Sequence, residues 1–208
     1  MTRGTDLSQN MEKFETFLKT ERNNAEVRVF LCGQGIDPQK TLSELAAAKS
    51  DKRAYLWERL EQDFDGCKVL LGEHDHLIEA YSHIFQAKTK DPRKVNLAKF
   101  EATLSKHVHL IVLFPESAGS FAELGLFTCP GGVPEKLFVI VEKHREHEPS
   151  YQNGFLGRGP IAEVKSARGW VRFLDYANLD EIYEAVSEVV AGIFEDVTTK
   201  NIFIKKDL

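Results

Sequence analysis

The chain has 208 residues, of which 42% are hydrophobic and 28% are charged. This length and composition are typical of one globular domain with a full hydrophobic core, and they disfavour an intrinsically disordered chain. The formal net charge is -5, so the overall charge gives no reason to expect a nucleic-acid-binding protein. The sequence shows no signal peptide and no apolar run long enough to span a bilayer. We therefore expect a cytoplasmic protein with no membrane partner.

Cysteine usage agrees with a reducing compartment. The cysteines are Cys32, Cys67 and Cys129, an odd number with no Cys-x-x-Cys pair. Cys32 and Cys67 lie in apolar, strand-like runs, where a buried free thiol is the expected state. The sequence therefore predicts no disulfide framework.

Strand-like and helix-like patterns alternate along the chain. An amphipathic helix is predicted over 10–20 and a first strand over 26–32. There follow a helix at 41–64, a strand at 67–71, helices at 75–88 and 94–106, a strand at 108–114, a helix at 120–128, a strand at 136–141, a loop at 143–160, a strand at 170–174 and a helix at 179–194.

This alternation predicts an α/β fold: a doubly wound, five-stranded parallel sheet with helices on both faces. For five such units we expect the flavodoxin-like or Rossmann-like strand order 2-1-3-4-5. We expect a helical leader over 1–25, the α/β domain over 26–196 and a tail over 197–208. Ligands bind such sheets at the carboxyl ends of neighbouring strands, so the site is expected just after residues 32, 72 and 114.

The segment after the third strand, PESAGSFAELG over 115–125, is the most informative part of the chain. Glu116 is expected at the strand tip and Glu123 in the first turn of the next helix. Two carboxylates in one crevice suit glycosidic bond cleavage, because one can attack the anomeric carbon while the other positions a hydroxyl or a proton. The helix dipole would favour the ionised, nucleophilic form of Glu123.

Small residues at the start of this helix favour a bound anion. The backbone around Ser117, Gly119, Ser120 and Phe121 would offer N–H groups to a phosphate or to sugar hydroxyls. A purely structural interpretation has comparable weight, because Ser120-x-x-Glu123 also fits a capping box, which needs no ligand.

Two other strand ends contribute candidates. Gly33 and Gln34 follow the first strand and begin a dinucleotide fingerprint that lacks its third glycine, so a tight turn that a ligand can approach is the safer prediction. Glu73 follows the second strand and is expected to border the same crevice. The histidines of the run GEHDH over 72–76 have no third ligand cluster at metal-site spacing, so we expect no metal.

The run IVLFPESAGSFAELG over 111–125 closely resembles the central motif of retron-associated effector toxins of the nucleoside 2-deoxyribosyltransferase-like superfamily. Three further features agree in the same order: VFLCG over 29–33, the acidic Glu73 after the second strand, and Gly159-Pro160 after the fourth. The resemblance covers residues 26–185.

Several expectations follow from this resemblance. It implies a doubly wound sheet, a nucleophile at Glu123 and a sugar-orienting acid at Glu116. The implied activity is that of an N-glycosidase that cleaves NAD or a related nucleotide in antiphage defence. NAD would then be a substrate, with no cofactor required. A reverse transcriptase and its RNA–DNA product would restrain the toxin.

Apolar segments at both chain ends bear on self-association. They are the stripe of Met11, Phe14, Phe17 and Leu18 and the run over 202–204. Such segments dock on their own domain or on a neighbour, because large exposed apolar patches are unusual in monomers. The resemblance favours a homo-oligomer, since related enzymes commonly assemble into oligomers.

Two other functions stay open from the sequence. A nucleoside or nucleotide deoxyribosyltransferase would use the same carboxylate, with a second base in place of water as the acceptor. A non-catalytic nucleotide-binding sensor subunit would use the same fold without turnover.

Overall fold

The computed structural model describes residues 25–37, 39–72 and 96–204. They form a parallel five-stranded sheet in the order β2-β1-β3-β4-β5, which confirms the predicted fold class. The strands are β1 (Val27–Cys32), β2 (Cys67–Leu71), β3 (Leu110–Leu113), β4 (Leu137–Glu142) and β5 (Trp170–Leu174). All residues of β3 are buried, as expected of a central strand that helices cover on both faces.

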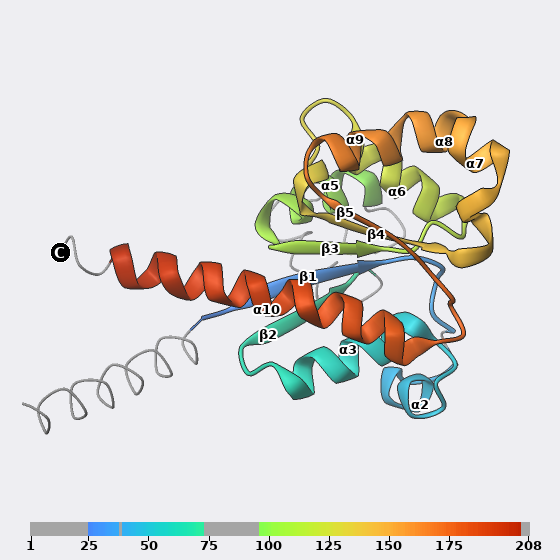
Figure 1. The fold of residues 1–208 in the computed structure, drawn as a ribbon. Helices are drawn as coiled ribbons and strands as arrows, with labels where there is room; N and C mark the ends of the chain where they lie inside the picture. Colours follow the sequence, from blue (N-terminus) through green and yellow to red (C-terminus); the bar gives the residue numbers. More distant parts are fainter. Residues whose placement is uncertain (1–24, 38, 73–95, 205–208) are drawn as a thin grey trace, which may run out of the picture.

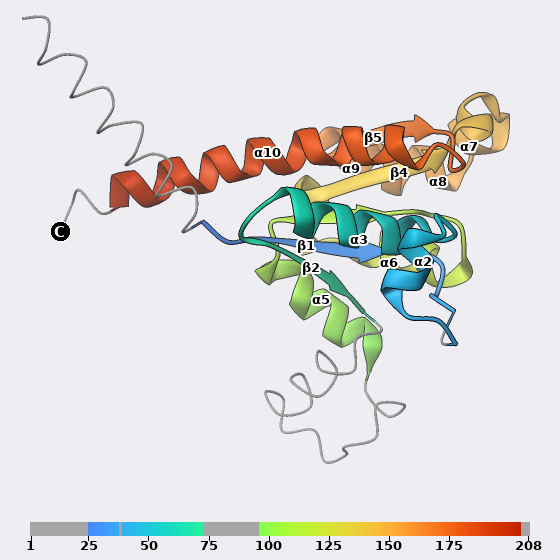
Figure 2. The same ribbon diagram turned by 90° about the horizontal axis from the view of Figure 1, so that it is seen from below.

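Two layers of helices enclose the sheet (Figures 1 and 2). One face is covered by α2 (Leu42–Ala47), α3 (Lys52–Asp63) and α10 (Leu179–Ile204), and the other by α5 (Leu97–His107), α6 (Ala118–Thr128) and α9 (Pro160–Ser166). Alternate strand residues serve the two faces. Leu31 joins the apolar cluster that includes Leu56 of α3, whereas Phe30 joins the cluster that includes Phe127 of α6.

The predicted helix over 41–64 is wrong as one element, since α2 and α3 are separate. Lys49 takes a left-handed backbone conformation with φ of 50°, which ends the first helical run. The side chain of Asp51 then accepts hydrogen bonds from the backbone of Arg53 and Ala54 and begins α3.

The predicted loop over 143–160 is also wrong, because it contains short helices. They are η3 (Lys143–His147), α7 (Pro149–Asn153) and α8 (Phe155–Arg158), and the 3₁₀ turn η2 (Pro134–Lys136) precedes β4. Pro149 and Pro160 stand at the start of α7 and α9. A proline there has a backbone angle already suited to a helix.

The last helix is longer than its apolar stripe predicts. α10 spans 26 residues and ends at Ile204, so it includes residues expected in the tail. No proline or glycine occurs over 195–204 to interrupt it. Among the described residues, no helix has the length and apolar character needed to cross a membrane. The leader helix expected over 10–20 and the helix over 75–88 lie outside the described residues.

Candidate functional site

The carboxyl ends of β1 and β3 lie side by side. Cys32 is the register partner of Leu113, and the N–H of Phe114 extends this pairing by donating to the Cys32 carbonyl at 3.0 Å. The residues that follow meet across the same edge, because the Gln34 N–H donates to Glu116 Oε1 at 3.3 Å. The structure thus brings Gly33, Gln34 and Glu116 together.

The start of α6 is fixed by two serines. Ser117 is the N-cap and its Oγ accepts the Ser120 N–H at 3.1 Å. Ser120 is fully buried, and its Oγ accepts the N–H groups of Glu116 at 3.0 Å and Ser117 at 2.9 Å. The capping box is therefore Ser117–Ser120 and not the predicted Ser120–Glu123.

This register moves Glu123 away from the helix start. α6 begins at Ala118 and has no acidic residue in its first turn, because Glu123 falls in the second turn. The helix dipole acts mainly within the first turn, so Glu123 lies too far along α6 for the dipole to act on it strongly. The first-turn N–H groups of Ala118 and Gly119 have no intrahelical acceptor, and both residues are exposed. These are the backbone donors that an anion could reach.

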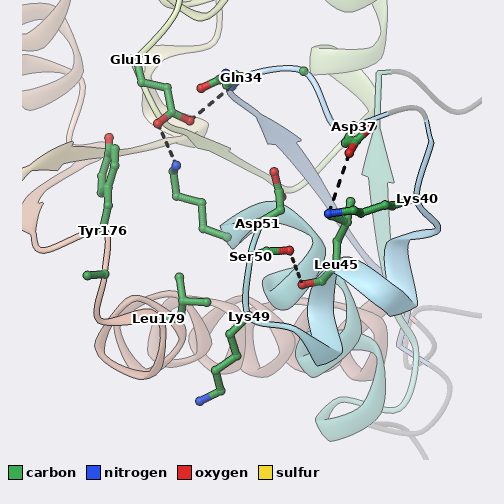
Figure 3. A pocket seen from close by; sticks show the side chains of 13 residues that line it. Gln34, Asp37, Lys40, Leu45, Lys49, Ser50, Asp51, Glu116, Tyr176 and Leu179 are labelled. Atoms are coloured by element: carbon green, nitrogen blue, oxygen red, sulfur yellow. Dashed lines mark hydrogen bonds and ion pairs between the residues drawn. The ribbon is translucent and has the colours of Figure 1, made fainter.

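A first cavity, the Glu116 hollow, has a volume of about 390 Å³. Its walls come from the β1–α2 loop, the start of α3 and the linker that leads into α10. Glu116 lies at one end of it, between Gln34 and Tyr176 (Figure 3). It is lined by Gln34, Gly35, Asp37, Lys40, Leu45, Lys49, Ser50, Asp51, Lys52, Glu116, Tyr176, Ala177 and Leu179.

Glu116 forms a largely buried ion pair inside this hollow. Lys52 Nζ lies 2.7 Å from Glu116 Oε2, and the two side chains are 17% and 19% exposed. The same ammonium lies 4.4 Å from the centroid of the Tyr176 ring. Burial raises the pKa of Tyr176, so its hydroxyl stays protonated and donates to the Ile140 carbonyl at 2.7 Å.

A second cavity, the Glu123 hollow, has a volume of about 300 Å³. It is lined by Phe30, Leu31, Arg53, Gly72, Leu97, Glu101 and Glu123. Glu123 and Glu116 therefore line different hollows, whereas we expected one crevice. The carboxylate that shares a hollow with Glu123 is Glu101 of α5. Glu73 lies outside the described residues, although the preceding Gly72 lines the Glu123 hollow.

Gly33 lies beside one side chain from each hollow, Arg53 and Glu116. A Cβ atom on Gly33 would lie 3.2 Å from Arg53 Cδ and 3.5 Å from Glu116 Oε1, so both side chains crowd this strand end. Arg53 is 3% exposed, lines the Glu123 hollow, and donates a hydrogen bond to the Gln34 carbonyl. The absence of a side chain at Gly33 thus lets groups from both hollows approach the same turn.

Sequence reasoning missed several residues of these hollows. Lys52 and Arg53 begin α3 directly after the N-cap Asp51, and that cap is the one signal that could have found them. Glu101 carries no local signal, because it is one charged residue on an amphipathic helix. Its placement depends on how α5 packs beside α6.

The described residues contain no group of three His, Cys, Asp or Glu side chains that could hold a metal ion. The histidines over 74–76 lie outside the described residues. The side chains of Cys32 and Cys67 are buried, and Cys129 is exposed. Burial raises the pKa of Cys67 to about 12, so this thiol is unreactive.

Comparison with known protein families bears on this arrangement. Residues 49–207 match the family described as STM3845 retron effector protein. The chain belongs to this retron effector family. The matched range includes Lys52, Arg53, Glu101, Glu116 and Glu123, and so most of the polar groups of both hollows.

Two curated relatives from Escherichia coli are similar to this chain. The "Retron Ec73 putative ribosyltransferase/DNA-binding protein" is 27% identical over an aligned length of 210 residues, which covers 95% of this chain and 60% of the relative. The "Retron Ec86 putative ribosyltransferase/DNA-binding protein" is 28% identical over 142 residues, which covers 66% of this chain and 37% of the relative. The chain therefore spans less than two thirds of either relative.

Proposed function

We propose that this retron effector cleaves the N-glycosidic bond of NAD or a related nucleotide, as an N-glycosidase of the nucleoside deoxyribosyltransferase-like type. The observation that carries the proposal is the Glu123 hollow, which is lined by the carboxylates of Glu101 and Glu123 and by the buried Arg53, near the carboxyl ends of β1 and β2. Most enzymes that hydrolyse glycosidic bonds use a pair of carboxyl groups. The names of the two relatives both include "putative ribosyltransferase", which agrees with this chemistry.

The proposed reaction has two steps. A carboxylate oxygen of Glu123 forms a bond to the anomeric carbon while the bond to the base nitrogen breaks, and the electron pair leaves with the base. When the base is a pyridinium ring, this pair neutralises the ring, so departure needs no proton. Water then attacks the glycosyl ester, Glu101 accepts its proton, and Glu123 is regenerated as a free carboxylate.

The two adjoining hollows favour a dinucleotide over a nucleoside. Their volumes of about 390 and 300 Å³ each match a small ligand portion, and Gly33 lies between them. We propose that the sugar to be cleaved reaches Glu123 past Gly33, that a sugar hydroxyl donates to Glu116, and that a phosphate approaches the N–H groups of Ala118 and Gly119.

Transfer to a second base is the alternative reaction, and the word ribosyltransferase in both relatives' names favours it. It needs the same glycosyl intermediate with a base nitrogen as the acceptor. Adding an acceptor base to the assay separates the two reactions. Transfer forms a new glycosidic bond to the added base, whereas hydrolysis releases the sugar portion with a hydroxyl at its anomeric carbon, which is ADP-ribose when the substrate is NAD.

We further propose that the effector acts in the cytoplasm as a homo-oligomer, restrained by a reverse transcriptase and its RNA–DNA product. Membership of the retron effector family supports the association with retron components. Light scattering tests the oligomer against the chain mass of 23.6 kDa. Copurification with the retron components tests the complex.

The experiment that tests the proposed activity is product analysis. The purified protein is incubated with NAD, and separately with nucleosides, and free base is measured by chromatography. Release of nicotinamide with ADP-ribose is the expected result. Binding of NAD by titration calorimetry without release of any base would instead indicate a non-catalytic sensor.

A further inference from the structure

Lys52 is held in the Glu116 hollow from both ends of its side chain. Its backbone begins α3, which Asp51 caps by accepting hydrogen bonds from Arg53 and Ala54. Its ammonium lies 2.7 Å from Glu116 Oε2. The lysine therefore connects the start of α3 to the segment between β3 and α6.

Two aromatic rings hold the ammonium in place. Its Nζ lies 4.4 Å from the centroid of the Tyr176 ring and 5.4 Å from that of Phe114. The rings pack edge to face at 5.6 Å, and the Tyr176 hydroxyl is tied to the Ile140 carbonyl. Cation–π attraction adds to the ion pair, because both lie largely out of water.

These contacts orient the Glu116 carboxylate but do not use all of its capacity to accept hydrogen bonds. Lys52 donates to Oε2 and the Gln34 N–H donates to Oε1. An ionised carboxylate has about four lone-pair sites, so each oxygen can accept one more hydrogen bond. A ligand hydroxyl in the hollow would find a carboxylate whose direction is already set.

We propose that Lys52 is a positioning residue: it holds Glu116 in the orientation that accepts a sugar hydroxyl, and so it sets substrate affinity and leaves the chemical step at Glu123 unchanged. This inference rests on the proposed role of Glu116 in sugar binding. Lys52 acts through Glu116 and reaches no reacting atom.

Arg59 provides a matched control on the same helix. It pairs with Asp63 at 3.1 Å, and its guanidinium lies 4.4 Å from the centroid of the Tyr183 ring, so it makes the same kinds of contact as Lys52. Arg59 lines neither hollow. Replacing it removes a cation, an ion pair and a ring contact from α3 without touching Glu116.

The test measures binding of ADP-ribose by titration calorimetry, which needs no turnover. Lys52→Met is expected to weaken binding by on the order of tenfold, because Glu116 loses the group that orients it. Lys52→Arg should restore most of the affinity, and Arg59→Met should stay within about twofold of wild type. Thermal unfolding of each variant checks that the fold is intact.

A double-mutant cycle tests whether Lys52 acts through Glu116. Glu116→Gln alone should weaken ADP-ribose binding, and adding Lys52→Met should cause little further loss, because coupled residues are not additive. Additive losses, or unchanged affinity in folded Lys52→Met, would overturn the proposal. So would an equal loss in Arg59→Met, or a wild-type protein that does not bind ADP-ribose.

Steady-state kinetics with NAD can show whether the positioning role or the proposed activity has failed. With NAD as substrate, Lys52→Met should raise KM and leave kcat within about twofold. Lys52-dependent binding of ADP-ribose by a wild-type protein that releases no base would contradict the proposed activity and support the positioning role. Base release with the same KM in wild type and Lys52→Met would contradict the positioning role alone.

Discussion

The buried hydroxyl of Ser120 accepts the backbone N–H of Glu116 at 3.0 Å. It also accepts the N–H of Ser117 and donates to the Ser117 carbonyl at 3.0 Å. The end of β3 and the start of α6 are thus joined by one side chain. The position of the Glu116 carboxylate therefore depends on a hydroxyl buried beneath the turn.

Ser120→Ala is expected to lower the free energy of unfolding by about 1–3 kcal/mol. It leaves the Ser117 N–H without its acceptor and removes one of the two acceptors of the Glu116 N–H, which also donates to the Phe114 carbonyl. Urea unfolding measures the change. Ser187→Ala is the control, since the Ser187 hydroxyl donates to the Glu184 carbonyl within α10 in a solvent-exposed hydrogen bond. Its effect should stay within about 0.5 kcal/mol. Equal effects of the two substitutions would show that Ser120 does not hold the turn.

Gly119→Val should weaken binding of ADP-ribose while the protein stays folded. A Cβ atom at Gly119 would approach Ser117 Oγ at 3.8 Å, which is ordinary contact, so the fold can accommodate it. The added branches would cover the first-turn N–H groups proposed for the phosphate. Gly125→Ala, in the same helix with open space around its Cβ, serves as the control. Unchanged affinity in Gly119→Val would place the phosphate elsewhere.

His109 should make the protein less stable in weak acid. Its Nδ1 accepts the Arg28 N–H at 3.0 Å, which requires a neutral ring. Burial, and then the charges of Arg28 and Lys136, lower the pKa of His109 below its ordinary value of 6.5. Below pH 6.5 the unfolded chain therefore binds a proton that the folded chain resists, and stability falls as the pH falls toward the folded pKa.

Urea unfolding between about pH 7.5 and 5.5 tests this dependence. His109→Gln keeps an acceptor for the Arg28 N–H but does not titrate, so its stability should change less with pH than that of wild type. The same slope in both proteins would rule out His109 as a source of the acid sensitivity.

The strands of the sheet could be predicted because each one is marked by the pattern of its own residues. Continuous apolar runs mark strands covered on both faces, and β2 and β5 begin and end at the predicted residues. The start of α6 was misplaced because two serines, at 117 and 120, compete for the cap. The structure settles this choice by burying Ser120 beneath the strand end.

The placement of some candidate residues could also be predicted, because it follows from the order of the strands. Gly33, Gln34 and Glu116 follow neighbouring strands, so the topology alone brings them together. Arg53 and Glu101 come from helices, and they reach the Glu123 hollow because of how those helices pack on the sheet. Sequence periodicity says which face of a helix is apolar, but not which charged residue on its edge meets a carboxylate.

The central claim is that Glu123 breaks the N-glycosidic bond. The most direct measurement compares nicotinamide release from NAD by wild type and by Glu123→Gln, with urea unfolding of both. Glutamine has nearly the same shape, and Glu123 lies outside the cap of α6, so stability should change by at most about 1 kcal/mol. Wild type should release nicotinamide and ADP-ribose in equal amounts, and the folded variant should lose turnover by several orders of magnitude. Nicotinamide release by the variant at a rate near that of wild type would contradict the account.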